Sequence, residues 1–192
     1  MMRGLMLAFA AAAMILAATP LARADSISYR WVVAADGEAS DYLAVVSAAA
    51  GSPDRERVVH KIPVGSVGNA PHSIGYTDDG AMLWVTGYRT NHIFIFDIRT
   101  DYTKPRLVRT IEDVVAQTGF SGLDGLWPST QIPGQMTIHF AAGSDGAGSG
   151  GIAEFTNEGE FLAAAVSTEA YLGSCCPLFL LDSDTAAASA DE

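Results

Sequence analysis

The chain has 192 residues, of which 49% are hydrophobic and 17% charged, and its 22 acidic residues against 11 lysines and arginines give a net charge of −11. This acidic balance excludes a nucleic-acid surface, which needs basic stripes to replace phosphate counterions. It also disfavours docking on anionic lipid. The composition is typical of a folded chain, and the length predicts one domain with a sizeable core.

The first 24 residues are typical of a secretory signal peptide. Arg3 supplies a positive start, Leu5 to Ala18 form an apolar run, and Ala22-Arg23-Ala24 places small residues where signal peptidase cleaves. The apolar run is shorter than the ~20 residues that a spanning helix needs. We therefore predict cleavage between Ala24 and Asp25, no stable membrane anchor, and a periplasmic or secreted protein.

Three strand-like patterns recur in the same order along the chain. Successive copies start roughly 50 to 60 residues apart, which is close to the period of a β-propeller blade. Hairpin turns are predicted at 78–80 and 157–159, where a glycine accepts a positive φ without penalty. The first pattern lies at 29–34, 81–86 and 135–140, the second at 41–46, 92–97 and 151–155, and the third at 57–62, 106–111 and 160–164.

Two further segments complete the repeat. Residues 72–76 and, less clearly, 122–127 read as additional strands that open the second and third copies, and 111–118 carries a short helical pattern that bridges these two copies. We therefore predict an all-β fold: a β-propeller of four-stranded antiparallel blades, with about three blades within residues 25–166.

The repeat pattern stops near Val166. Residues 167–192 combine a short apolar stretch with an Ala/Ser/Asp-rich end. We expect them to form a divergent, disordered tail. Propellers close with about four to eight blades, so three blades would leave sheet faces rich in Val, Ile, Phe and Trp open to water. We therefore expect a truncated form of a longer protein that is marginally stable, aggregates, or covers these faces by self-association.

Short stretches of the three repeats resemble the selenium-binding protein family, which includes methanethiol oxidases. The resemblance runs from about Tyr29 to Val166 and covers the amino-terminal part of a seven-bladed propeller. It implies oxidation of methanethiol with oxygen to formaldehyde, hydrogen sulfide and hydrogen peroxide, at a copper held by histidines near the propeller axis. The stretches that carry it are 41–46 with 52–53 and 58–63, 91–97 with 100–101 and 104–107, and 150–151 with 154–159.

The resemblance directs attention to His72 and Asp124. His72 falls where the family opens an inner strand with a pair of histidines, and the second place of the pair is Ser73 here. Asp124 holds the equivalent place in the third repeat and could add a carboxylate beside His72. Each has a structural alternative: a hydrogen-bonded role for His72, and for Asp124 a cap on a turn from Gly122 to Gly125.

Other family ligands are missing from the matching positions. Residues 75–79 contain no cysteine where the family binds selenium, so no selenium-binding residue is assigned, and 120–128 contain no histidine. His60, His92 and His139 are interpreted as structural residues of middle or outer strands. The cofactor is left unknown, with copper implied by the resemblance alone.

Two functions therefore remain open. One inner histidine without a cysteine favours a non-catalytic propeller that binds a small molecule or a protein partner. The alternative is a copper-dependent methanethiol oxidase relative, for which no catalytic residue is assigned. The glycine-rich stretch 143–151 lacks the Lys-Ser/Thr of a phosphate loop and is predicted to be a hairpin connection.

Overall fold

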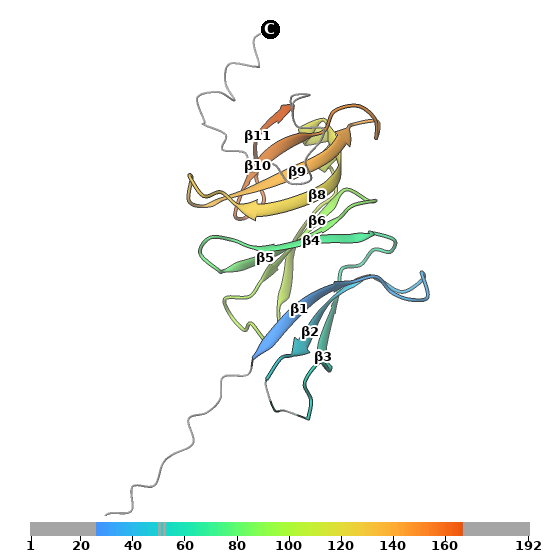
Figure 1. Ribbon diagram of the computed structural model, residues 1–192, viewed down its shortest axis with the longest axis vertical. Coiled ribbons are helices and arrows are strands. Elements are labelled where there is room, and N and C mark those ends of the chain that lie inside the picture. Colours follow the sequence, from blue (N-terminus) through green and yellow to red (C-terminus); the bar gives the residue numbers. More distant parts are fainter. Residues whose placement is uncertain (1–25, 50, 52, 167–192) are drawn as a thin grey trace, which may run out of the picture.

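The computed structural model describes residues 26–49, 51 and 53–166, and these form three antiparallel β-sheets and one short helix (Figure 1). Neighbouring strands of each sheet are consecutive in the sequence. The predictions for the leader and the tail lie outside these residues. The first sheet contains β1 (Ile27–Val32), β2 (Tyr42–Ser47) and β3 (Val58–Pro63).

The second and third sheets each have the four predicted strands, whereas the first has three. The second sheet contains β4 (Pro71–Tyr76), β5 (Met82–Gly87), β6 (His92–Asp97) and β7 (Arg106–Ile111). The third contains β8 (Phe120–Pro128), β9 (Gln135–Gly143), β10 (Gly151–Thr156) and β11 (Phe161–Val166). All eleven strands correspond to predicted segments, which confirms the all-β fold.

The three sheets follow one another along the long axis of the molecule (Figure 1). The first strands of the sheets, β1, β4 and β8, succeed one another along this stack, and β4 packs closely against β8. We call these three strands the inner strands.

The second sheet is buried on both faces because successive side chains of a strand point to opposite sides. On β5, Trp84 joins a large apolar cluster with the third sheet, while Leu83 and Val85 join a smaller cluster with the first sheet. Burial of such side chains stabilises the fold by roughly 25 cal/mol per Å² of apolar area.

The bridge between the second and third sheets is the helix α1 (Val114–Thr118), as its short helical pattern predicted. The helix ends at Gly119, whose φ of +75° lies in the left-handed region that a glycine adopts without strain. Val114 is buried in the large apolar cluster. Within the described part of the chain, no helix has the length and apolar character that a membrane crossing requires.

The two predicted hairpin turns also tie the second sheet to the third. Asp78 accepts hydrogen bonds from the Asn157 side-chain amide at 2.7 Å and from the Gly134 backbone N–H at 3.0 Å. The indole N–H of Trp84 donates to the backbone carbonyl of Asn157 at 3.1 Å. The turn at 78–80 is therefore a junction between sheets as well as a hairpin.

The largest fully buried apolar side chains lie between the sheets. Trp84, Phe94, Phe96, Phe140 and Phe155 are all fully buried. Apolar side chains such as Val58 of the first sheet and Val166 of the third are nevertheless exposed, so the expectation of open apolar faces stays a prediction.

Candidate functional site

The inner strands β4 and β8 approach each other closely at Gly75. A Cβ added to Gly75 would lie 2.6 Å from the Leu126 Cδ1 atom, so any larger residue would force that leucine to move. This close approach brings side chains of β4 and β8 next to each other, where the second sheet packs against the third.

The carboxylate of Asp124 on β8 lies between two imidazole rings. Its Oδ1 is 3.5 Å from Nε2 of His72 on β4, and its Oδ2 is 3.4 Å from Nδ1 of His139 on β9. The structure thus places His72 and Asp124 together, as their equivalent positions in the repeat suggested. Their assignment as metal ligands stays a prediction.

The predicted turn from Gly122 to Gly125, with Asp124 as its cap, is wrong. These residues lie inside β8, and the pairing of β8 with β9 is interrupted by a bulge between Leu123 and Gly125. A bulge adds one residue to a strand and redirects its side chain, and here the extra residue is Asp124. The hydroxyl of Ser73 on β4 donates to the backbone carbonyl of Asp124 at 2.6 Å and fixes the bulge against the neighbouring sheet.

The sequence interpretation missed His139. It lies on the second strand of the third sheet and pairs with Gly125 across β8 and β9. Because its neighbours Ile138 and Phe140 belong to the large apolar cluster, alternation turns His139 to the opposite face. Gly125 has no side chain to cover it, so the imidazole can reach Asp124.

The side chains of His72, Asp124 and His139 form one polar cluster, and they become less exposed from β4 through β8 to β9. The side chain of His72 is 43% exposed, that of Asp124 33% and that of His139 20%. The ring of His72 also lies against Tyr88, with 5.3 Å between the ring centroids. A shallow hollow of about 360 Å³ adjoins His72 and is lined by Val33, Gly68, Ala70, Pro71, His72, Tyr88 and Arg89.

The described residues do not fit a copper ion by themselves. Copper in proteins is held by several ligands, commonly imidazoles, that converge on one point. Here each carboxylate oxygen faces a different imidazole, and residues 26–166, so far as they are described, contain no group of three His, Cys, Asp or Glu placed to hold a metal. His60 on β3 and His92 on β6 lie on other strands and take no part in the cluster.

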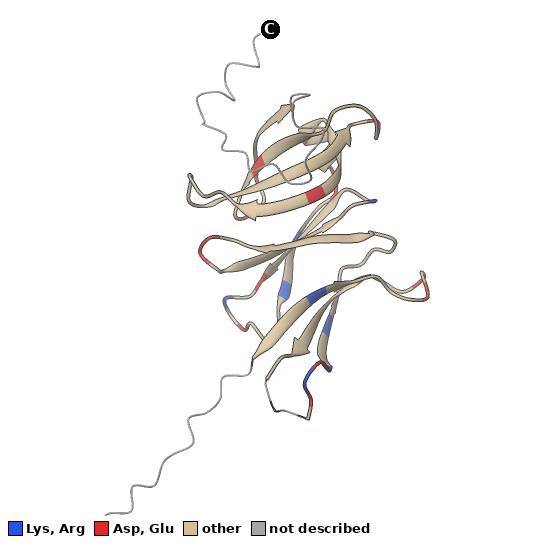
Figure 2. Ribbon diagram, in the orientation of Figure 1, with Lys and Arg blue, Asp and Glu red and all other residues tan. Residues whose placement is uncertain are grey.

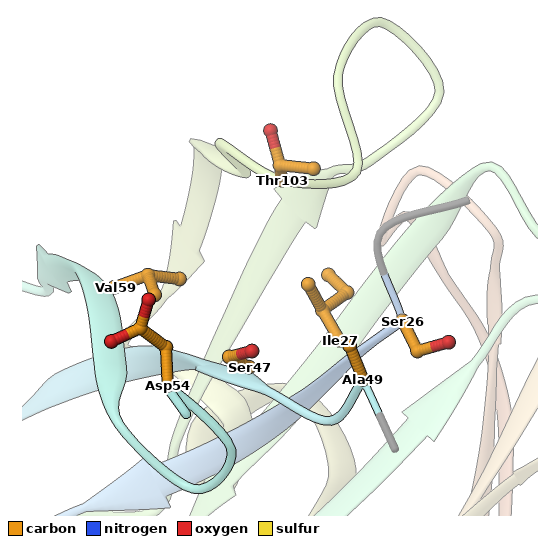
Figure 3. A pocket seen from close by; sticks show the side chains of 7 residues that line it. All are labelled: Ser26, Ile27, Ser47, Ala49, Asp54, Val59 and Thr103. Carbon is orange, nitrogen blue, oxygen red and sulfur yellow. The ribbon is translucent and has the colours of Figure 1, made fainter. Parts of the chain in front are cut away.

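A second hollow, of about 330 Å³, lies at one end of the first sheet (Figure 3). Thr103, from the connection between β6 and β7, stands opposite Asp54 and Val59 across this hollow. Asp54 is the one ionisable residue among its lining residues, and it lies 2.5 Å from Nη1 of Arg57. This hollow therefore offers fewer groups for binding or catalysis than the cluster of His72, Asp124 and His139. Its other lining residues are Ser26, Ile27, Ser47 and Ala49.

Comparisons with known proteins agree with this architecture. A hypothetical selenium-binding protein from Sulfolobus tokodaii superposes with a TM-score of 0.64 at 22% identity, over 72% of this chain and 34% of that chain. No protein-family model matches the chain. The stacked sheets and this structural likeness define the described part of the chain as a partial β-propeller.

Sequence comparison gives the family. The methanethiol oxidase of Ruegeria pomeroyi is 31% identical over 142 residues, which are 72% of this chain and 32% of that protein. The methanethiol oxidase of a Hyphomicrobium species is 34% identical over 127 residues, which are 66% of this chain and 28% of that protein. The chain thus spans about a third of the length of these curated relatives. Over that part it belongs to the selenium-binding protein family, which includes the methanethiol oxidases.

Proposed function

We propose that this chain is a non-catalytic binding module of the selenium-binding protein family, which binds a small molecule beside its inner strands. The observation that carries the proposal is the bridging carboxylate. Because Asp124 directs one oxygen to each of two imidazoles, its two oxygens face different rings and the side chains of the cluster do not converge on one point.

The lining of the hollow beside His72 is suited to a small ligand with an anionic group and an apolar body. Arg89 supplies a positive charge and His72 a polar ring, while Tyr88 and Val33 offer apolar surface. A volume of about 360 Å³ accommodates a compact organic molecule. The signal-peptide pattern of residues 1–24 supports export of this module to the periplasm or beyond.

A second candidate function, copper-dependent oxidation of methanethiol, is favoured by the relatives. Both curated relatives are methanethiol oxidases, and the resemblance places His72 where the family opens an inner strand with a pair of histidines. In this alternative the remaining ligands must come from outside the described residues, since His72 and Asp124 alone would leave most coordination positions to water.

The two candidates are separated by loading the full chain with copper, removing excess with a mild chelator, and measuring the retained metal and the peroxide released from methanethiol. We expect neither stoichiometric copper nor peroxide above the buffer level. One copper per chain that disappears in His72→Ala, together with peroxide release, would establish the oxidase and overturn the proposal.

The binding function is tested with benzoate, a carboxylate with an apolar ring. We expect benzoate to shift the imidazole NMR signals of His72, and we expect the shift to weaken in Arg89→Ala. The distant Arg99→Ala serves as the matched control because it removes the same charge outside the hollow. An unchanged His72 signal at saturating benzoate would rule out a small-anion site in this hollow.

A further inference from the structure

Asp41, directly before β2, is a buried carboxylate that lies outside the polar cluster, with only 1% of its surface exposed. Its Oδ1 accepts a hydrogen bond from the Ala34 backbone N–H at 3.0 Å. Its Oδ2 accepts two from Asn69, from the backbone N–H at 2.8 Å and from the side-chain amide at 2.9 Å. A buried carboxylate is tolerated when its oxygens are hydrogen-bonded in this way. Asp41 therefore fixes Asn69, which lies in the connection between β3 and β4.

Asn69 is itself fully buried and links Asp41 to the turn between β5 and β6, residues 88–91. Its Oδ1 accepts a hydrogen bond from the Thr90 hydroxyl at 2.7 Å, and its backbone carbonyl accepts one from the Arg89 N–H at 3.1 Å. The packing at this point is tight, since a Cβ added to Gly87 would lie 2.6 Å from the Thr90 Oγ1 atom. We call Asp41, Asn69 and Thr90 the Asp41 network.

The residue after Asn69 has a strained backbone. Ala70 has a φ of +53°, in the left-handed region that a residue with a Cβ disfavours. It also precedes Pro71, and a residue before proline is normally extended. The Ala70 carbonyl accepts a hydrogen bond from the Tyr88 N–H at 3.1 Å. Such strain persists where the surrounding structure holds it, and it is concentrated at ligand-binding and active sites.

Both segments that the Asp41 network holds line the hollow beside His72. Gly68, Ala70, Pro71 and His72 come from the connection to β4 and its start, and Tyr88 and Arg89 come from the turn. Basic colour marks this turn and acidic colour marks β8 in Figure 2. No ion pair among the described residues includes Arg89, so its charge is available to an anion.

We propose that Asp41, Asn69 and Thr90 are positioning residues of the small-anion site, which hold Ala70 and the main chain of Arg89 in the arrangement that receives the ligand. This inference rests on the proposed binding function. None of the three lines the hollow, so they act through the residues that do. A main chain that is held in place beforehand pays less entropy when a ligand binds. Loosening the network therefore weakens binding while the lining residues stay the same.

Thr90→Val tests the link between Asn69 and the turn, because it removes the hydroxyl with little change of shape. We expect the backbone amides of Tyr88 and Arg89 to exchange with solvent roughly fivefold faster, and benzoate to bind roughly fivefold more weakly by the His72 imidazole signal, as for the loss of one hydrogen bond. Thr90→Ser keeps the hydroxyl and should restore both values.

Thr77→Val is the matched control. Thr77 lies beside the start of β5, whereas Thr90 follows its end, and its Oγ1 donates to Asp79 at 2.6 Å and accepts from the Met82 N–H at 3.1 Å. Its loss should lower the melting temperature at least as much as Thr90→Val, with the exchange of Tyr88 and Arg89 and the benzoate affinity unchanged. An equal loss of affinity in both valine variants would show a general effect of destabilisation and overturn the proposal.

Asp41→Asn tests the buried end of the network. The new amide places an N–H against the donors of Ala34 or Asn69, so we expect a larger loss of benzoate affinity than in Thr90→Val, in a chain that circular dichroism shows to be folded. If Asp41→Asn does not fold, Thr90→Val decides.

Two results separate this inference from the binding function. Benzoate that fails to bind the parent chain would overturn the binding function and the inference with it. Benzoate that binds the parent and Thr90→Val equally well, or amide exchange at Tyr88 and Arg89 that does not change, would overturn the inference alone.

Discussion

The two contacts between sheets use the same residue type in different surroundings. Trp84, between the second and third sheets, is fully buried and donates its indole N–H to the Asn157 carbonyl. Trp31, between the first and second sheets, is half-buried and donates to the Thr86 carbonyl at 2.9 Å. Both indole N–H groups are thus hydrogen-bonded, and the two tryptophans differ in how deeply they are buried.

Strand number explains this difference. The second and third sheets each have four strands, so an inner strand shields the side chains of the strand behind it. The first sheet has three, and its β1 occupies the inner edge itself, where Tyr29 and Trp31 stay partly exposed. The contact between the four-stranded sheets is therefore the stronger one, and the site is built across it.

The largest expected effect is the loss of Trp84. We expect Trp84→Ala to lower the free energy of unfolding by about 3–5 kcal/mol, the cost of removing a fully buried tryptophan. Trp31→Ala should cost clearly less, since part of its ring already contacts water. Urea unfolding of both variants measures the difference, and Trp84→Phe and Trp31→Phe separate the hydrogen bond from the packing. Equal losses at the two positions would contradict the ranking of the two contacts.

A smaller effect concerns the Asp78 junction between the same two sheets. The Asn157 amide and the Gly134 N–H hold the pKa of Asp78 below its usual value of 3.8. A carboxyl with a lowered folded-state pKa stabilises the fold above the unfolded-state pKa, and this contribution is lost as the pH falls through the folded-state value. Asp78→Asn should therefore melt lower than the parent at pH 6, with a difference that narrows as the pH falls below about 4.

The melting temperature of both chains between pH 6 and pH 3 measures this narrowing. Asn157→Ala removes the main donor to Asp78 and should reduce the same part of the pH dependence. A constant difference between the parent and Asp78→Asn over the whole range would show that Asp78 contributes nothing through its charge.

The strands could be predicted because their patterns depend on local sequence. Alternation and turn glycines identified every described strand, and the repeat of three patterns gave the stacking of sheets. The order of strands within a sheet followed from short hairpin connections such as Asp78–Gly80. Which side of each strand meets the neighbouring sheet was not predicted, because it depends on how the sheets stack.

The site was only partly predictable for a similar reason. His72 was identified from its place at the start of an inner strand. Asp124 was identified as a carboxylate that could lie beside His72. Its structural alternative, a cap on a turn, was wrong, since the glycines on both sides of it are typical of turns as well as of bulges. His139 was missed because its proximity to Asp124 depends on the bulge, which shifts the pairing of β8 with β9. His139 stands between the apolar Ile138 and Phe140, and this alternation was the available signal that its side chain points away from the apolar core.

The bridging carboxylate is the central claim, and imidazole NMR of Asp124→Asn tests it most directly. A long-range ¹⁵N–¹H spectrum reports on each histidine ring separately, and His60 and His92, which lie on other strands, serve as internal controls. We predict that the signals of His72 and His139 both move in the variant while those of His60 and His92 stay in place. Movement of only one of the two rings, or of neither, would contradict a carboxylate shared between them.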